Sequence, residues 1–147
     1  MKIEEGHLLK FIPPILDGNS YGNKKRYMLV INCDDENNTI EMINVSSIKG
    51  KEHKLLYDSN IEIKNYNPLP VPTFAKLDTL YTIDNFSDLQ KFMSFNGTKI
   101  SNSEISNIKL QRYNYIKNCN PTNVINYSET DFKKTNFIKT WDGMPMP

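Results

Sequence analysis

The chain has 147 residues, of which 38% are hydrophobic and 24% are charged, with 18 basic side chains against 17 acidic ones. This balance is typical of one folded domain and argues against a disordered chain, since a chain of this length buries roughly two-thirds of its unfolded surface. A net charge of +1 argues against capture of nucleic acid by overall charge, although a local basic patch remains possible.

The longest apolar stretches, residues 8–15 and 27–31, are far shorter than the roughly 18 to 20 residues of a membrane span. Residues 1–7 lack the apolar core of a signal peptide, so we expect a cytoplasmic protein with no membrane association. Two cysteines and two histidines match neither a disulfide framework nor the ligand spacing of a zinc site. Glycine-rich phosphate loops, dinucleotide fingerprints and His-Glu-x-x-His are also missing, and we expect no metal and no cofactor.

The first half of the chain is dominated by strand patterns. Residues 8–15 predict a strand that leads into a glycine-containing loop, and the continuously apolar residues 27–32 predict a strand buried on both faces. A turn at 34–38 and alternation over 39–45 then predict a hairpin. Further short strands are expected at 55–57, 61–63, 73–77 and 80–83, with the prolines between 68 and 72 in a rigid loop.

After Asp84 the pattern changes to helical spacing. Ser87 can cap a short helix, and residues 101–104 have capping-box spacing before a helix that continues to about Lys117. Its apolar stripe should contain the side chains Ile105, Ile108, Tyr115 and Ile116, with Arg112 packed along its stem and exposed at its head.

These patterns predict a mainly β protein with appended helices. Residues 1–118 form the predicted domain, a small barrel followed by two helices. Residues 119–147 show no sustained period but are too apolar for a flexible linker, so we expect a tail that packs on the domain or on a partner subunit.

The best candidate for chemistry is the basic run that ends at Arg26. Lys24, Lys25 and Arg26 stand between the glycine-containing loop and the buried strand, where three cations can grip a phosphodiester and the arginine can stabilise charge on phosphorus oxygens. A solvated basic loop is the alternative. His7 and His53 are the side chains with an ordinary pKa near neutrality, whereas Asp34 and Asp35 should raise the pKa of the Cys33 thiol.

Four segments in register carry a resemblance to a known family. Residues 6–11, 25–31, 41–47 and 76–84 follow the order and approximate spacing of the MazF/PemK (Kid-type) toxin endoribonucleases. The segment that opens with Arg26 resembles the family's Arg-Pro-x-Leu-Val-Ile block, with Tyr27 in place of the proline. The resemblance covers roughly the first two-thirds of the chain.

This resemblance implies an SH3-like, PemK-type barrel and a homodimer that cleaves single-stranded RNA without a metal and is neutralised by a cognate antitoxin. It implies a catalytic role for Arg26 and, by spacing, for Ser46, where the family has threonine. His53 is our candidate for proton transfer, and Tyr21 and Tyr66 are candidates for stacking on unpaired bases. We expect RNA contacts from the residues Lys24, Lys25, Tyr21, Ser47, Lys49 and Lys51.

Three alternatives remain open from the sequence, one of which, an oligomeric structural protein of a mobile element, depends only on the unassigned residues 119–147. A protein of the same fold can bind RNA or a protein partner without cleaving anything, because fold does not determine function. A ribonuclease of the ToxN type is inhibited by a structured RNA instead of a protein antitoxin.

Overall fold

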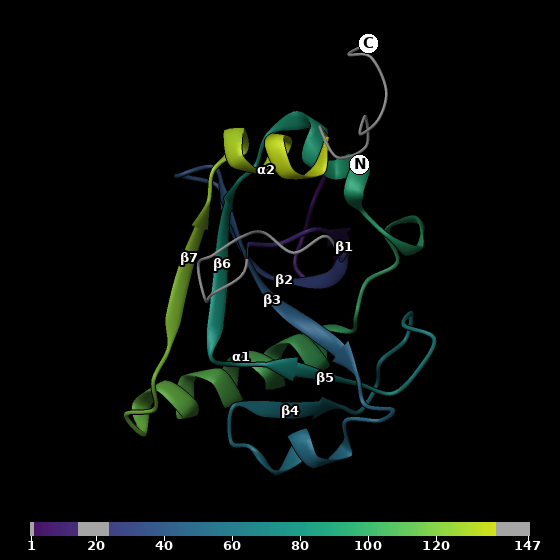
Figure 1. Ribbon diagram of the computed structural model, residues 1–147, viewed down its shortest axis with the longest axis vertical. Coiled ribbons are helices and arrows are strands. Elements are labelled where there is room, and N and C mark those ends of the chain that lie inside the picture. The colour runs from purple at the N-terminus through teal and green to yellow at the C-terminus, as the bar shows by residue number, and fades with distance from the viewer. Residues whose placement is uncertain (1, 15–23, 138–147) are drawn as a thin grey trace.

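The computed structural model describes residues 2–14 and 24–137. These residues form seven strands and two α-helices, joined by short 3-10 helices (Figure 1). The strands are β1 (Leu8–Phe11), β2 (Arg26–Asp34), β3 (Thr39–Ser47), β4 (Asn60–Ile63), β5 (Thr73–Lys76), β6 (Thr79–Asp84) and β7 (Asn123–Tyr127). The helices are η1 (Glu52–Leu56), η2 (Ser87–Phe92), η3 (Phe95–Gly97), α1 (Asn102–Lys117) and α2 (Glu129–Asn136).

The strands form one mainly antiparallel sheet in the order β1-β2-β3-β5-β4. The β3 strand also pairs with β6, and β7 extends that branch as the one parallel neighbour among the described strands. Within the described residues the sheet is not closed, because β1, β4 and β7 each pair with a single strand. The predicted class, mainly β with appended helices, is confirmed, and the narrower SH3-like barrel stays a prediction.

The central strands are buried on both faces, as the apolar run at 27–32 predicted. Met28 and Val30 face one core cluster, whereas Leu29 and Ile31 face the other, because successive side chains of a strand point to opposite sides. The predicted hairpin is also confirmed, since β2 and β3 pair in antiparallel register around a turn that contains Asn38 at φ 54°. We call the cluster that contains Met28 and Val30 the first core cluster and the one that contains Leu29 and Ile31 the second. Helix α1 covers the second core cluster, and α2 covers the first.

Helix α1 begins where the capping-box spacing predicted. The Ser101 hydroxyl accepts a hydrogen bond from the Glu104 backbone amide at 3.3 Å. The Glu104 carboxylate accepts instead from the Asn65 backbone amide at 2.9 Å, so the second half of the box ties the helix to the loop after β4. Ile105 and Ile108 are buried, but the prediction for Ile116 was wrong, because its side chain is 41% exposed at the outer end of the helix.

Part of the predicted tail belongs to the sheet and the core. Residues 123–127 form β7 beside β6, and residues 129–136 form α2, capped by Ser128. Phe132 is fully buried, and the buried Asn136 accepts a hydrogen bond from the Ile12 amide at 2.7 Å. For these residues the structure shows packing on the chain's own domain.

One predicted strand is wrong. Residues 55–57 do not form a strand, because Leu55 and Leu56 end η1 and Tyr57 follows as its C-terminal cap. Leu56 is 83% exposed and Tyr57 is 56% exposed, so these apolar residues have no sheet face to cover. The segment with alternating prolines is a loop between β4 and β5, as predicted. In the described part of the chain, no helix combines the length and apolar character needed to cross a membrane.

Candidate functional site

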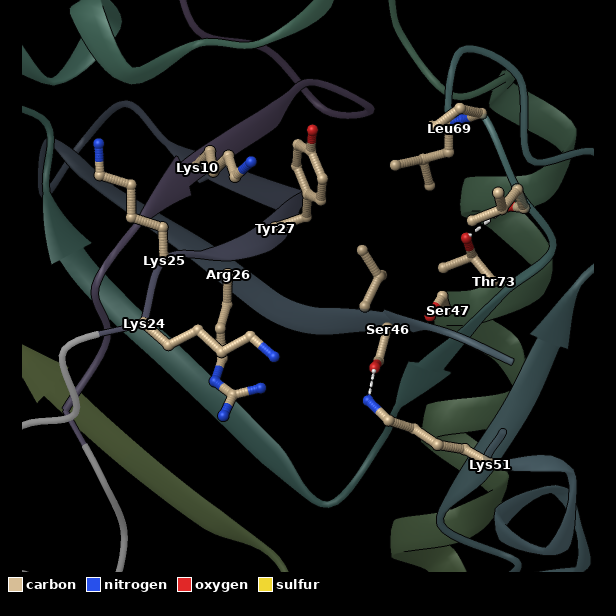
Figure 2. A pocket seen from close by; sticks show the side chains of 13 residues that line it. Lys10, Lys24, Lys25, Arg26, Tyr27, Ser46, Ser47, Lys51, Leu69 and Thr73 are labelled. Atoms are coloured by element: carbon tan, nitrogen blue, oxygen red, sulfur yellow. Dashed lines mark hydrogen bonds between the residues drawn. The ribbon is translucent and has the colours of Figure 1, made fainter. Parts of the chain in front are cut away.

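A cavity of about 240 Å³ opens where the start of β2 lies beside the end of β3 and the start of β5 (Figure 2). The side chains of Arg26 and Lys24 lie on one side of the cavity, near the start of β2, and those of Ser46 and Lys51 lie on the opposite side (Figure 2). The complete lining is Lys10, Lys24, Lys25, Arg26, Tyr27, Val45, Ser46, Ser47, Lys51, Leu69, Pro70, Val71 and Thr73.

The charge that the described residues bring to this lining is positive. Four lysines and one arginine contribute to it, and no described aspartate or glutamate does. Among the described residues, the ion pairs of the protein involve other lysines, so none of these five cations is neutralised by a carboxylate within 4.0 Å. Although the whole chain carries a net charge of only +1, the cavity concentrates positive charge in a small volume.

Strand register brings the two sides of the cavity together. Tyr27 of β2 pairs with Val45 of β3, and the next β3 residue, Ser46, pairs with Phe74 of β5. Arg26 pairs with Phe11 on the other edge of β2 and is exposed. Arg26 and Ser46 each stand one position beyond the Tyr27–Val45 pair, so both lie at the same end of the β2–β3 ladder.

Lys51 reaches the cavity through a tight turn after β3. The Lys51 amide donates to the Ile48 carbonyl at 2.7 Å, and Gly50 takes the positive φ of 79° that the turn needs. The turn directs the side chain back to β3, where Nζ of Lys51 donates to Oγ of Ser46 at 2.9 Å (Figure 2). Because the ammonium group uses the oxygen of Ser46 as an acceptor, the hydroxyl hydrogen of Ser46 is free to point at an anion.

The directions of the pKa shifts indicate electrostatic repulsion between the cations of the cavity. Burial lowers the pKa of Lys51, and the charges of Lys54, Lys24 and Arg26 lower it further. Burial also raises the pKa of Tyr81, while the positive charge of Arg26 acts in the opposite direction. Arg26 is thus close enough to both Lys51 and Tyr81 to act on them electrostatically.

Aromatic rings support the wall on the β1 side. Tyr27 is half-buried and stacks on Phe95, with ring centroids 5.4 Å apart and an interplanar angle of 24°. Nζ of Lys10 lies 4.9 Å from the centre of the Tyr27 ring, within the range of a cation–π contact. Tyr66, a candidate for base stacking, packs against the second core cluster and is not part of the lining.

The structure brings together most of the residues that the sequence selected. Six of them line the cavity: Lys24, Lys25, Arg26, Ser46, Ser47 and Lys51. His53 lies in η1 and Lys49 in the preceding turn, and both are exposed and outside the lining. Tyr21 lies outside the described residues.

His7 and Cys33, two ionisable side chains that the sequence analysis also considered, pack into the protein outside the cavity. His7 is 2% exposed, its Nδ1 accepts a hydrogen bond from the Glu4 amide at 2.8 Å, and burial lowers its pKa. Burial also raises the pKa of Cys33, with Glu5 and Asp35 contributing, and the thiol donates to the Ile3 carbonyl. The direction of the Cys33 pKa shift agrees with the prediction, but its largest cause is burial, and Asp34 is not among the groups that contribute.

Sequence reasoning missed Lys10 and the β4–β5 loop as parts of the site. Lys10 is exposed on β1 between the buried residues Leu9 and Phe11. The alternation of apolar and charged residues in the sequence could have identified it as a surface position of the strand. The loop contributes Leu69, whose buried side chain fixes the loop over the cavity. Its position depends on the packing of β4 against β5, which no local pattern encodes.

Within the residues that the structure describes, no three His, Cys, Asp or Glu side chains gather in a way that could hold a metal ion. A scan of the chain against protein-family models found no match, and a search of curated proteins found no similar protein. The resemblance to the MazF/PemK family therefore stays a prediction, and the chemistry of the cavity has to carry any functional argument.

Proposed function

We propose that the protein is a cytoplasmic endoribonuclease that cleaves single-stranded RNA at this cavity without a metal, as the toxin of a toxin–antitoxin system. The observation that carries the proposal is the lining itself, in which, among the described residues, five cations and four hydroxyl side chains surround the cavity and no carboxylate does. Phosphodiesters are the biological groups that such a set binds best, since they offer negative charge and hydrogen-bond acceptors together.

Each step of RNA cleavage has a matching group. The 2′-oxygen attacks phosphorus, the bond to the 5′-oxygen breaks, and the products are a 2′,3′-cyclic phosphate and a 5′-hydroxyl. Arg26 stabilises the charge that develops on the phosphorus oxygens, and Ser46 donates its hydroxyl hydrogen to one of them. Lys51, an ammonium group whose pKa is lowered, can donate a proton to the 5′-oxygen as its bond to phosphorus breaks, and water accepts the 2′-hydroxyl proton.

The test is cleavage of a long defined RNA in EDTA, with cut sites mapped by primer extension and the new ends identified chemically. Wild-type protein should give reproducible cuts with cyclic phosphate and 5′-hydroxyl ends. Arg26→Ala should abolish them, and Arg26→Lys should leave a small residue of activity, because lysine keeps the charge but loses the two-pronged donor geometry.

Two further variants separate the candidates for proton transfer. Lys51→Gln should lower the cleavage rate by about 100-fold, the scale of one general acid or base, whereas His53→Ala should leave it unchanged. Lys134→Gln, on α2 at the far end of the sheet from β4 and β5 (Figure 1), is the control for loss of one exposed charge. Intact RNA with wild-type protein of demonstrated fold would contradict the proposal.

A second candidate function is a non-catalytic module that binds RNA. One observation favours it, because the described residues of the lining include neither histidine nor carboxylate side chains, the usual general bases. RNA binding that is lost in Arg26→Ala, without any cleavage by the wild type, would establish this function. The inhibitor, a protein antitoxin or a structured RNA, and the homodimer belong to the toxin proposal and are tested by co-purification from the native host.

A further inference from the structure

A second group of cations lies beside the cavity but outside its lining. Lys76 ends β5 and Lys54 lies in η1, and both side chains are half-buried. Burial lowers the pKa of Lys76, and the charges of Lys54, Arg26 and Lys51 lower it further, with Asp78 as the opposing carboxylate. The two groups of cations therefore adjoin each other.

The fold fixes Lys54 next to Lys76. Asn60 of β4 pairs directly with Lys76 of β5, and its side-chain amide donates to the Lys54 carbonyl at 2.9 Å. The Lys54 amide in turn donates to the Lys51 carbonyl at 2.9 Å, which links this group to the cavity. Neither Lys54 nor Lys76 has a carboxylate within 4.0 Å among the described residues.

An exposed aromatic ring accompanies the two lysines. Tyr57 is 56% exposed at the C-terminal end of η1, where its amide donates to the Lys54 carbonyl and its carbonyl accepts from the Asn60 amide. Leu56, 83% exposed, precedes it. An exposed ring and unneutralised cations on one short segment are the kinds of side chain with which proteins hold one nucleotide of a single strand, by stacking on the base and pairing with the phosphate.

We propose that Lys54, Lys76 and Tyr57 form a second nucleotide subsite, which binds a nucleotide next to the one held in the cavity. This inference rests on the proposed function and narrows its substrate to a strand with at least two consecutive phosphodiesters. A polyanion that spans both groups of cations relieves their mutual repulsion, so the longer ligand gains more than its extra contacts alone.

The experiment measures binding of fluorescent 2′-O-methyl RNA, which cannot be cleaved, by anisotropy at several salt concentrations. One ligand is a dinucleotide with a single phosphodiester, and the other is a single strand of about eight nucleotides. Tyr57→Ala should weaken binding of the longer strand by at least about fivefold and leave the dinucleotide unchanged. Tyr113→Ala is the matched control, because Tyr113 is 62% exposed on α1.

The double variant Lys54→Gln with Lys76→Gln tests the charges. Affinity falls as salt rises, so the slope of log affinity against log salt is negative. For the longer strand this slope should become shallower by about 0.7, the value for one phosphate of a single strand. Lys76→Arg should keep the wild-type slope, and Lys134→Gln should also keep it. If the double variant does not fold, the comparison of the two tyrosine variants still decides the question.

Two outcomes would overturn the subsite, and they differ in what else they affect. Wild-type protein that cleaves RNA, with Tyr57→Ala equal to Tyr113→Ala and an unchanged salt slope in the lysine variant, refutes the subsite alone. Wild-type protein that binds neither ligand and cleaves no RNA removes the proposed function together with the subsite.

Discussion

Replacement of Phe132 by alanine should remove a large part of the stability of the whole domain. Phe132 lies in α2, within residues for which the sequence predicted only a tail, yet its ring is fully buried. It contacts four other rings, with centroid distances between 4.9 and 5.3 Å, namely those of Phe11, Phe86, Phe92 and Tyr127. These rings come from β1, from the residues around η2 and from β7, so one side chain joins three separate parts of the chain.

The expected cost is about 4 kcal/mol. Truncation of a buried phenylalanine to alanine costs about 3 to 5 kcal/mol, and loss of favourable ring contacts adds about 0.5 to 1.5 kcal/mol for each pair that does not relax. Partial collapse of the cavity offsets some of this, so the middle of the range is the best value. For a domain of this size the corresponding decrease in Tm is about 15 °C.

Urea unfolding followed by circular dichroism measures this change. The midpoint should decrease while the slope stays that of the wild type, because the variant loses stability without changing the surface exposed on unfolding. Val124→Ala is the control, since Val124 lies in β7 but is 60% exposed, and it should change the free energy of unfolding by less than about 0.5 kcal/mol. A loss below about 1 kcal/mol for Phe132→Ala would refute the packing of α2 on the sheet.

Two further predictions concern single residues near the start of the chain. Gly6→Ala should lower the free energy of unfolding by about 3 kcal/mol, because Gly6 has φ +95° and a Cβ there would meet the Ile100 carbonyl oxygen at 2.7 Å. Gly50→Ala is the control, since Gly50 has φ +79° but open space around it, and it should cost only about 1 kcal/mol. Urea unfolding measures both changes. The stability should also decrease below pH 6.5, because burial lowers the pKa of His7 below its ordinary 6.5 and the unfolded chain then takes up a proton that the folded one does not. His7→Gln should lessen this decrease between pH 7.5 and pH 5.5, and an identical pH dependence in the variant would refute the reasoning.

The elements that the sequence predicted well are those whose signal is local. The apolar run that became β2 needs no partner to be recognised, because continuous burial follows from its composition. The Ser101 cap and the start of α1 were likewise predicted from four adjacent residues. In such segments local preference and tertiary packing agree.

The elements that the sequence missed depend on distant partners. β7 has a short, half-exposed pattern, and it is a strand because β6 offers its edge in parallel register. α2 has one fully buried aromatic, Phe132, and it is fixed by the contact of Asn136 with Ile12, 124 residues away. The apolar triplet that ends at Tyr57 is the opposite case, since it was predicted as a strand but Leu56 and Tyr57 are largely exposed.

The candidate site divides in the same way. The basic run that ends at Arg26 was visible in the sequence, and Ser46 was selected through the family resemblance. The contact between Lys51 and Ser46 and the approach of Lys76 to Arg26 could not be predicted, because they arise from a turn and from strand register. The sequence therefore identified the basic and hydroxyl side chains of the cavity better than its extent.

The branching of β3 has a consequence for how ligands and the fold affect each other. The first half of β3 pairs with β6 over four residue pairs, and its last three residues pair with β5, with Ile43 and Asn44 between them. Lys24 and Arg26 belong to the β2 side of this branch, whereas Lys51, Lys54 and Lys76 belong to the arm built from η1, β4 and β5. The three β3–β5 residue pairs join these two parts of the sheet. A polyanion that contacts both sets of cations acts as a non-covalent cross-link between the parts, so its binding should stabilise the packing of β4 and β5 on the rest of the domain.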